Sequence, residues 1–376
     1  MEVRLYKSTG NFINVSEMKK LAQVAARICY SDKDIDGLDE EPYNSNLVDG
    51  RLITSGHHSP FEHAHLTFYM KVPKIIAMVL NNERQYVTSE KSARFTIMKD
   101  MAPIQKELYD KWMDKLIPAI AEIYPPMKDL EARNIAIKKL AQENARYVTS
   151  VFTPTKMLHT INLRQLNFIL NEFGDYVKSK SSSDNVFERR LAASMQEFLE
   201  QPLGLNIEGL ENRTDKHLSI FNFENSSNTF GDVYSTEYFM SFAGLAQAHR
   251  HRTISYNAII PENKSSYFYV PSIVKHMGAE DSWLSDLEEV SKNDYPQAQL
   301  LIVRERGNIE DFRSKCLLRL CGHAQHEIML NTLETAVEYS KNTPQVKGWI
   351  APKCTQGFMC KEPCIWTGKK ALERIV

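Results

Sequence analysis

The chain has 376 residues, enough for about two or three ordinary domains, and its 43% hydrophobic and 25% charged residues are typical of a globular protein. A formal net charge of −1 gives no electrostatic support for a nucleic-acid partner or an anionic membrane. No apolar run approaches the roughly 18 residues of a membrane-spanning helix, and the N-terminus lacks a signal-peptide pattern. Six cysteines are too few for a disulfide scaffold, so we expect a cytoplasmic protein with reduced thiols.

Hydrophobic periodicity predicts the main elements in chain order. A helix is expected within residues 14–31, with Ser16 as its N-cap, and a strand is expected over residues 65–72. The helical pattern returns in three later segments, 105–127, 162–173 and 184–202. The proline pair at 125–126 should end the first of these, and the polar run 178–185 should be a loop.

The sequence also contains an internal repeat. When Arg84 is set against Arg252, an offset of 168, each side shows a strand-like stretch, an apolar helix-like stretch and a charged turn. Later segments match when Glu188 is set against Glu327, an offset of 139, so the second copy is shorter. We predict a first copy over 1–205, a second over 206–345, and a tail over 346–376.

Two short segments stand out within this repeat. The first is "HHSPFEH", residues 57–63, and the second is "QAHRHRTISYN", residues 247–257. The second places two guanidiniums around an imidazole directly after an apolar run, which points to a buried anionic or electron-rich ligand. The alternative is a cationic turn at a helix C-terminus that stabilises only the helix dipole.

Together these segments resemble the motifs of the flavin-dependent thymidylate synthases. The pattern of that family reads H-x-[ST]-P-F-E-H, then Q-x-x-R-H-R-x-x-S-x-N-E-x-S-x-R, then N-x-R, and finally A-Q-x-E-I-R. The resemblance covers most of residues 50–100, 155–195, 235–260 and 305–335. It implies an α+β fold, here duplicated, in which each copy is a mainly antiparallel sheet flanked by helices.

Each copy keeps only part of the pattern. The first copy has lost most of the R-H-R segment but keeps Glu90, Ser92, Arg94, Asn162, Arg164 and Arg190. The second copy keeps Gln247, Arg250, His251, Arg252, Ser255 and Asn257, but Ala258, Ile260, Glu310 and Met329 stand at later motif positions. Because the sites of this family form where subunits of a homotetramer meet, the two copies could share one composite site. The resemblance therefore implies a homodimer of two-copy chains.

The reaction implied by the resemblance is methylation of dUMP to dTMP. Methylene-tetrahydrofolate would supply the carbon, NAD(P)H would reduce FAD, and the reduced flavin would supply the hydride. The residues that the resemblance implies for catalysis are Arg250, His251, Arg252 and Arg190. Those implied for substrate binding are Gln247, Glu90, Ser92, Arg94 and Arg190. Those implied for FAD binding are His57, Ser59, Glu62, Arg250, His251, Asn257, Asn162 and Arg164.

Two other activities remain open from the sequence. A related flavin- and folate-dependent enzyme could modify C5 of another pyrimidine nucleotide, for instance by hydroxymethylation. An inactive relative could bind flavin or nucleotide without turnover.

The tail raises a separate metal question. Cys354, Cys360 and Cys364 lie close together, but their spacing is not that of a standard zinc ribbon. Unligated thiols are the favoured interpretation, so we expect no metal, and a zinc site or an iron–sulfur cluster stays an alternative.

Overall fold

The computed structural model describes residues 1–12, 14–94, 96–210, 217–223, 227–261, 267–358, 364–366 and 368–376. The chain forms two compact units, and each is built from two stretches of sequence. Unit 1 comprises Met1–Lys91 and Pro154–Leu218, and unit 2 comprises Ser92–Thr153 and Ser219–Val376. The units therefore do not coincide with the two predicted copies, because residues 92–153 of the first copy belong to unit 2. The boundaries of the copies themselves stay a prediction.

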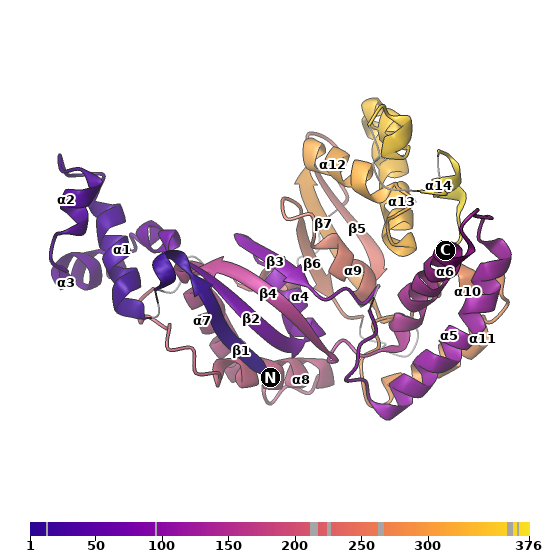
Figure 1. Ribbon diagram of the computed structural model, residues 1–376, viewed down its shortest axis with the longest axis horizontal. Coiled ribbons are helices and arrows are strands. Elements are labelled where there is room, and N and C mark those ends of the chain that lie inside the picture. Colours follow the sequence, from indigo (N-terminus) through magenta and orange to yellow (C-terminus); the bar gives the residue numbers. More distant parts are fainter. Residues whose placement is uncertain are drawn as a thin grey trace. The chain divides into compact units, whose positions relative to one another are not determined.

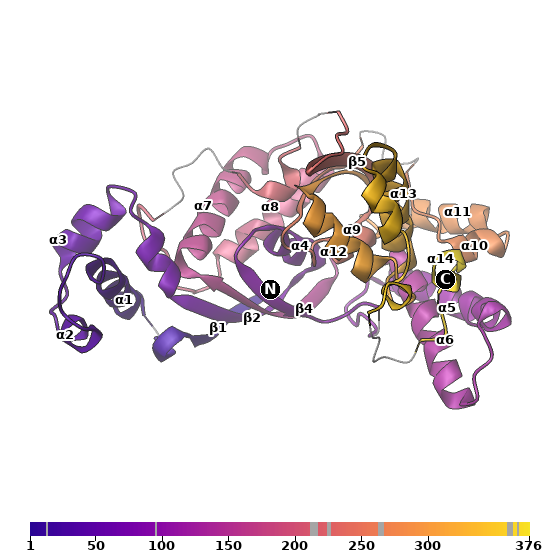
Figure 2. The same cartoon turned by 90° about the horizontal axis from the view of Figure 1, so that it is seen from above.

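Unit 1 contains a four-stranded antiparallel sheet in the order β1-β2-β4-β3. Its strands are β1 (Glu2–Ser8), β2 (His65–Pro73), β3 (Tyr86–Glu90) and β4 (Pro154–Asn162). Alternate residues of β2, from Leu66 to Val72, are buried, as expected for a strand with one covered face. That face packs against α4 (Lys74–Asn82) and α7 (Leu163–Lys180), and α8 (Val186–Leu199) packs against these two helices. Figures 1 and 2 show α7 and α8 on the same side of the sheet.

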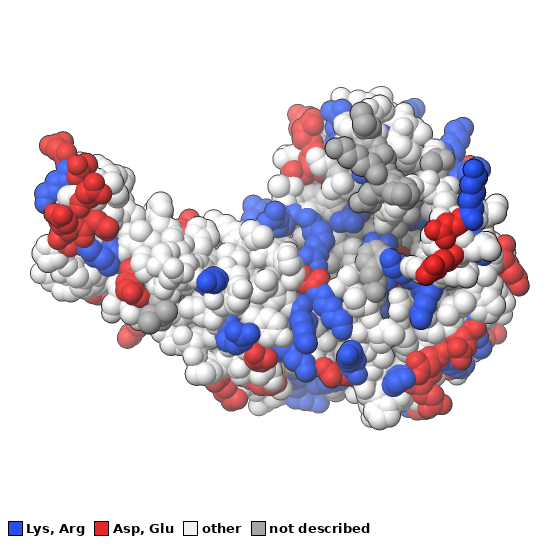
Figure 3. All heavy atoms as spheres, in the orientation of Figure 1, with Lys and Arg blue, Asp and Glu red and all other residues white. Residues whose placement is uncertain are grey.

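Short helices connect β1 to β2 in unit 1. They are α1 (Val15–Arg27), α2 (Ile35–Asp39), α3 (Ser45–Leu47), the π-helix η2 (Val48–Ile53) and the 3-10 helices η1 (Thr9–Asn11) and η3 (Ser59–His63). The prediction of Ser16 as N-cap is wrong: Asn14 caps α1 and accepts a hydrogen bond from the backbone N of Glu17 at 3.0 Å. Acidic side chains gather over α2 at the left of Figure 3. The net charge of the chain is near zero, but this exposed region is locally acidic.

The expected loop at 178–185 is shorter than predicted. Helix α7 continues through Lys180, because residues 178–180 still form helical hydrogen bonds and Lys178 pairs with Asp175 one turn earlier. The predicted helix ending at the proline pair is confirmed, since α5 ends at Ile123.

Unit 2 contains a three-stranded antiparallel sheet in the order β5-β7-β6. Its strands are β5 (Val233–Ser241), β6 (Ser255–Ile259) and β7 (Leu300–Asn308). Helices α9 (Phe242–Ala248), α12 (Ile309–Arg319) and α13 (His326–Asn342) pack on one face, here called the inner face (Figure 1). The remaining short helices of this unit are η4 (Arg146–Val148), η5 (Ser219–Phe221), η7 (Pro344–Trp349), η8 (Lys353–Thr355) and α14 (Lys370–Glu373).

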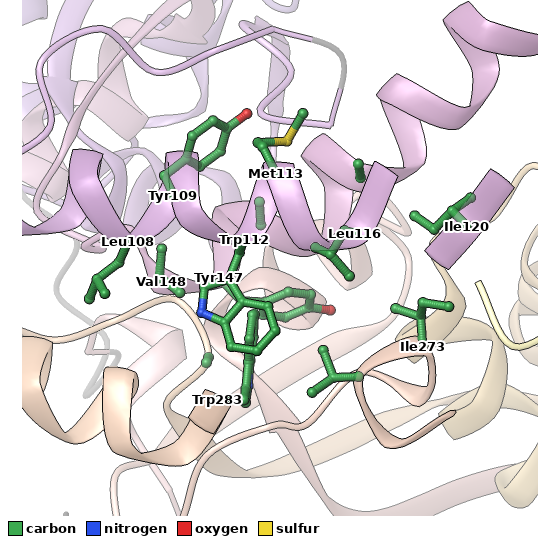
Figure 4. Close-up of a cluster of buried hydrophobic side chains, with 14 of the residues drawn as sticks. Leu108, Tyr109, Trp112, Met113, Leu116, Ile120, Tyr147, Val148, Ile273 and Trp283 are labelled. Carbon is green, nitrogen blue, oxygen red and sulfur yellow. The ribbon is translucent and has the colours of Figure 1, made fainter. Parts of the chain in front are cut away.

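A second layer of unit 2 is helical. It comprises α5 (Pro103–Ile123), α6 (Leu130–Ala145), α10 (Ser272–His276) and α11 (Glu280–Ser291), packed around the core cluster of Figure 4. Trp112 and Trp283 meet edge to face at the centre of that cluster, with ring centroids 4.7 Å apart. Each indole N–H finds an acceptor: Trp112 donates to Asp286 and Trp283 donates to the backbone O of Tyr269.

The structure confirms the α+β fold. The two halves of the chain also share the same order of helices and strands. The succession β2-α4-β3-α5-α6-β4-α7-α8 in the first copy corresponds to β5-α9-β6-α10-α11-β7-α12-α13 in the second. The orders β2-β4-β3 and β5-β7-β6 are the same arrangement. Asn162 and Asn308 occupy the same place and each caps the helix that follows its strand. No helix in the described part of the chain is long and apolar enough to cross a membrane.

Candidate functional site

In unit 1 an ion pair joins the "SPFEH" segment to the N-x-R segment. Glu62 lies in η3 and Arg164 lies in the first turn of α7, and Leu163 N donates to Ala64 O between these elements at 2.9 Å. The Nη1 of Arg164 is 2.7 Å from Oε1 of Glu62, and about a third of each side chain is exposed, 31% and 32%. The fold therefore brings together two residues that are 102 positions apart, at a place that solvent reaches.

The other unit 1 residues predicted to bind FAD are close in sequence to Glu62 or to Arg164. His57 and Ser59 are exposed at the start of η3. Asn162 is buried, accepts a hydrogen bond from Gln165 N at 2.8 Å, and donates to Gln85 Oε1 at 3.3 Å. Asn162 thus has a structural role as a helix cap in addition to any contact with a ligand.

The substrate candidates of unit 1 differ in how far their side chains are already engaged. The Glu90 side chain is 2% exposed and its Oε1 lies 2.6 Å from Lys74 Nζ, while Asn81 donates to Oε2 at 3.4 Å. The carboxylate is therefore part of a buried ion pair. Arg190 lies on α8 and is partly exposed.

In unit 2 the R-H-R turn follows α9. Arg250 and Arg252 are exposed, whereas His251 between them is buried. Burial, followed by the charges of Arg319 and Lys315, lowers the pKa of His251 to about 2. The turn therefore consists of two exposed arginine residues and one buried, neutral imidazole, and the expected buried ligand stays a prediction.

A third arginine, which carries no motif signal in the sequence, lies against this turn. Arg319, at the end of α12, donates from Nε to Nε2 of His251 at 2.7 Å and from Nη2 to the backbone O of Gln247 at 3.1 Å. Because a guanidinium can only donate, Nε2 of His251 is the acceptor and the ring proton sits on Nδ1. Arg319 thereby fixes both the tautomer of His251 and the position of the turn.

Arg94 of the E-x-S-x-R motif also belongs to unit 2 and is already paired. Its Nε donates to Glu143 and its Nη2 donates to the backbone O of His323 at 3.0 Å. The Oγ of Ser92 accepts from the backbone N of Arg94 at 3.3 Å. A first-copy motif residue therefore packs directly against the second-copy loop that leads into α13.

A buried polar network includes the A-Q-x-E segment of the second copy, residues 324–327. Arg146 Nη2 donates to Gln325 Oε1 at 2.8 Å, and Tyr147 OH donates to Glu327 Oε2 at 2.7 Å. Glu327 also accepts from the backbone N and the hydroxyl of Ser241, each at 2.7 Å. Burial raises the pKa of Glu327 and outweighs these hydrogen bonds. Sequence reasoning missed Arg146 and Tyr147, since both lie in a helical segment with no motif.

The second copy has Met329 at the position of the last arginine of the family pattern. An arginine of the tail, Arg374, contacts this methionine. Arg374 is buried, and its Nη1 lies 2.8 Å from Sδ of Met329, the residue set against Arg190. Its guanidinium also donates to the backbone O of Cys321 and Ala324. Within the tail, the described segment around Arg374 therefore packs as part of unit 2, and the buried guanidinium anchors it.

The remaining candidates of unit 2 are placed as follows. Asn257 on β6 donates to the backbone O of Ser219 at 2.5 Å. Cys354 is exposed, and Cys364 Sγ donates to the backbone O of Trp366 at 3.4 Å, whereas Cys360 lies outside the described residues. Among the residues that the structure describes, no three His, Cys, Asp or Glu side chains are grouped to hold a metal ion.

Two solved structures are similar to parts of this chain. A UMP/dUMP methylase from Streptomyces cacaoi is 18% identical and aligns with 54% of this chain and 92% of its own, with a TM-score of 0.32. A flavin-dependent thymidylate synthase from Helicobacter pylori, complexed with FAD and dUMP, is also 18% identical and aligns with 56% of this chain and all of its own, with a TM-score of 0.30.

Sequence comparison gives the family. Residues 12–174 match the sequence model described as thymidylate synthase complementing protein. A flavin-dependent thymidylate synthase of Thermosipho africanus is 28% identical over 166 residues, and one of Pseudothermotoga lettingae is 32% identical over 155 residues. Each alignment covers 39% of this chain, and they span 68% and 66% of the relatives, about two thirds of their length. Residues 12–174 of this chain therefore match the flavin-dependent thymidylate synthase family.

Proposed function

We propose that this chain catalyses flavin-dependent modification of dUMP at C5, and specifically its methylation to dTMP with methylene-tetrahydrofolate and NAD(P)H. The observation that carries the proposal is the match of residues 12–174 to the family, with the R-H-R segment displaced to the second copy. Reduced FAD would supply the hydride when bound. The chain's own residues bind, orient and polarise the nucleotide.

The donor set fits a flavin dinucleotide and a nucleotide monophosphate. Arg250 and Arg252 are exposed residues, and the planar fork of a guanidinium is suited to phosphate oxygens. Neutral His251, locked with its proton on Nδ1, offers a hydrogen-bond donor that does not change between pH 5 and 8. Cationic groups fixed near the uracil carbonyl oxygens would stabilise the negative charge that grows there as C5 becomes nucleophilic.

The packing of unit 2 supports a composite site. Arg94, a first-copy motif residue, donates to the second-copy loop at His323, close in sequence to Gln325 and Glu327 of the A-Q-x-E segment. We infer that the copies divide one site between them. The first copy would provide Ser92, Arg94, Arg164 and Arg190, and the second copy would provide Gln247 and the R-H-R turn.

An absorbance titration of the purified chain tests the proposal. We expect oxidised flavin bands near roughly 375 and 450 nm that shift when dUMP is added, since both ligands would share one site. Reduction by NADPH, addition of methylene-tetrahydrofolate and mass spectrometry of the nucleotide then identify dTMP as the product. A 5-hydroxymethyl product would redirect the assignment within the family, and a chain that takes up no FAD would refute it.

Asparagine caps provide a matched pair of variants for the flavin site. Asn162→Ala and Asn308→Ala should each lower the free energy of unfolding by about 1 kcal/mol, because each removes a helix N-cap. Only Asn162→Ala should also weaken FAD binding, since Asn162 is followed by Arg164 whereas Asn308 is followed by Glu310. Urea denaturation and flavin titration measure the two effects. Equal FAD affinity in both variants would remove Asn162 from the site.

A further inference from the structure

Two arginines stand on the outer face of the unit 2 sheet, opposite the inner face that carries the helices. Arg304 and Arg306 alternate with Glu305, whose carboxylate is held from the inner face by Lys315 of α12. In the strand register Arg304 lies between Glu237 and Asn257, and Arg306 lies between Ser235 and Ser255. Both Ser255 and Asn257 belong to the R-H-R-x-x-S-x-N motif.

The segment from η5 to Phe223 covers part of this face. Asn257 donates to Ser219 O, and the Phe223 ring lies over the Arg304 guanidinium, whose Cζ is 5.4 Å from the ring centroid. As a result Arg304 has no exposed surface, although its partner Glu237 is 36% exposed and marks the open side of the face. Arg306 and Ser255 are only partly buried.

The polar groups of this face are incompletely satisfied within the described part of the chain. Arg304 Nη2 is 2.5 Å from Glu237 Oε2, but its Nε and Nη1 are buried without a hydrogen-bond partner. The same holds for Nε of Arg306 and Oγ of Ser235. A buried guanidinium with unused donors is costly, so a ligand that accepts those hydrogen bonds would stabilise the folded state.

The first copy shows that the sheet does not need these cations. At the positions corresponding to Arg304 and Arg306, its strand β4 carries Leu158 and Thr160. Thr160 pairs its hydroxyl with Thr67 at 2.8 Å, and no guanidinium takes part. The two arginines are therefore a feature of the second copy rather than a requirement of the fold.

We propose that Arg304 and Arg306 form a binding site for a phosphate-class oxyanion. The Cα atoms of alternate residues in a strand lie about 7 Å apart, so two arginine side chains from such positions on one face can both reach one phosphate or diphosphate group. Glu237 neutralises one of the two charges, which leaves an excess of one positive charge for the anion. Ser235 contributes a hydroxyl and Asn257 borders the site. This site lies beyond the proposed function, because neither arginine belongs to a family motif.

Thermal unfolding of the full chain in inorganic phosphate, against chloride at equal ionic strength, tests the site. The wild type should gain several degrees in Tm as phosphate rises, because a ligand that binds only the folded state stabilises it. Arg304→Leu and Arg306→Thr, which install the first-copy residues, should lose this shift. Arg313→Gln, an exposed arginine of α12, is the matched control and should keep it.

The Tm of the variants without phosphate separates a role of the arginines in folding from a role in phosphate binding. Without phosphate, Arg304→Leu should unfold at or above the wild-type Tm, since it removes unsatisfied buried donors and leaves Glu237 solvated. A wild type with no phosphate-specific shift, or variants that shift as the wild type does, would overturn the proposal.

Competition identifies the source of the phosphate. If saturating dUMP or FAD abolishes the Arg304-dependent shift, the phosphate of that nucleotide occupies the site. If the effects add, the site binds free phosphate or diphosphate separately. Because these measurements need no turnover, an enzyme that fails the methylation assay can still show the shift, so the two proposals fail independently.

Discussion

Replacing Lys315 by methionine should lower the free energy of unfolding by about 3–5 kcal/mol, because it leaves the carboxylate of Glu305 buried without a cation. Lys315 Nζ lies 2.5 Å from Glu305 Oε2, and neither side chain has any exposed surface. The hydroxyls of Tyr234 and Tyr238 also donate to this carboxylate, but they carry no charge to balance it. Urea denaturation at neutral pH measures the loss.

The double variant Lys315→Met with Glu305→Gln is the control for this experiment. An amide keeps an acceptor for the two tyrosine hydroxyls while removing the stranded charge, so it should recover a large part of the stability. If the single variant stayed within about 1 kcal/mol of the wild type, the ion pair would not be the element that holds α12 against β7.

Much of the fold could be predicted from local pattern. The strand at 65–72 and the helices that became α5, α7 and α8 follow from periodicity and from the proline pair, which act over neighbouring residues. Two details failed for local reasons. Asn14 competes with Ser16 as N-cap, and the lysines at 178 and 180 continue α7 because lysine is a good helix former. That each unit is built from two separate stretches of sequence could not be predicted, because it depends on the long-range packing of residues 92–153.

The candidate site shows the same division. Motif spacing singles out the R-H-R turn and the "SPFEH" segment, and it predicts that the two copies keep different motif residues. It gives no signal for Arg319, because one arginine near the end of an amphipathic helix looks like part of a solvated face. It also treats Arg250, His251 and Arg252 as equals, whereas burial separates the neutral imidazole from its exposed neighbours. Burial is a property of tertiary packing, which spacing does not report.

Replacing Arg319 by leucine should lower kcat/KM for nucleotide modification by about 10²–10³-fold, under the proposed function, because a preorganised donor is lost from the turn. Arg319 holds Gln247 O and His251 Nε2 together, so we regard it as a positioning residue for the R-H-R segment. Arg319→Lys should restore part of the activity by returning a donor, and Arg313→Leu on the same helix should leave it unchanged. Activity of Arg319→Leu within about threefold of the wild type would contradict this role.

The protonation state of His251 provides a readout that does not depend on turnover. In the wild type its pKa of about 2 means that the ring stays neutral down to well below pH 5, with the proton on Nδ1. Because the folded state binds its proton less readily than the unfolded state, His251 contributes stability above pH 6.5 that is lost as the pH falls. Removing Arg319 deletes the larger of the two cationic contributions, so the pKa should rise, but burial should keep it below 6.5. Nitrogen-15 NMR of the imidazole across pH 4–8 detects both the rise and the loss of the fixed tautomer, neither of which a merely loosened helix end would produce.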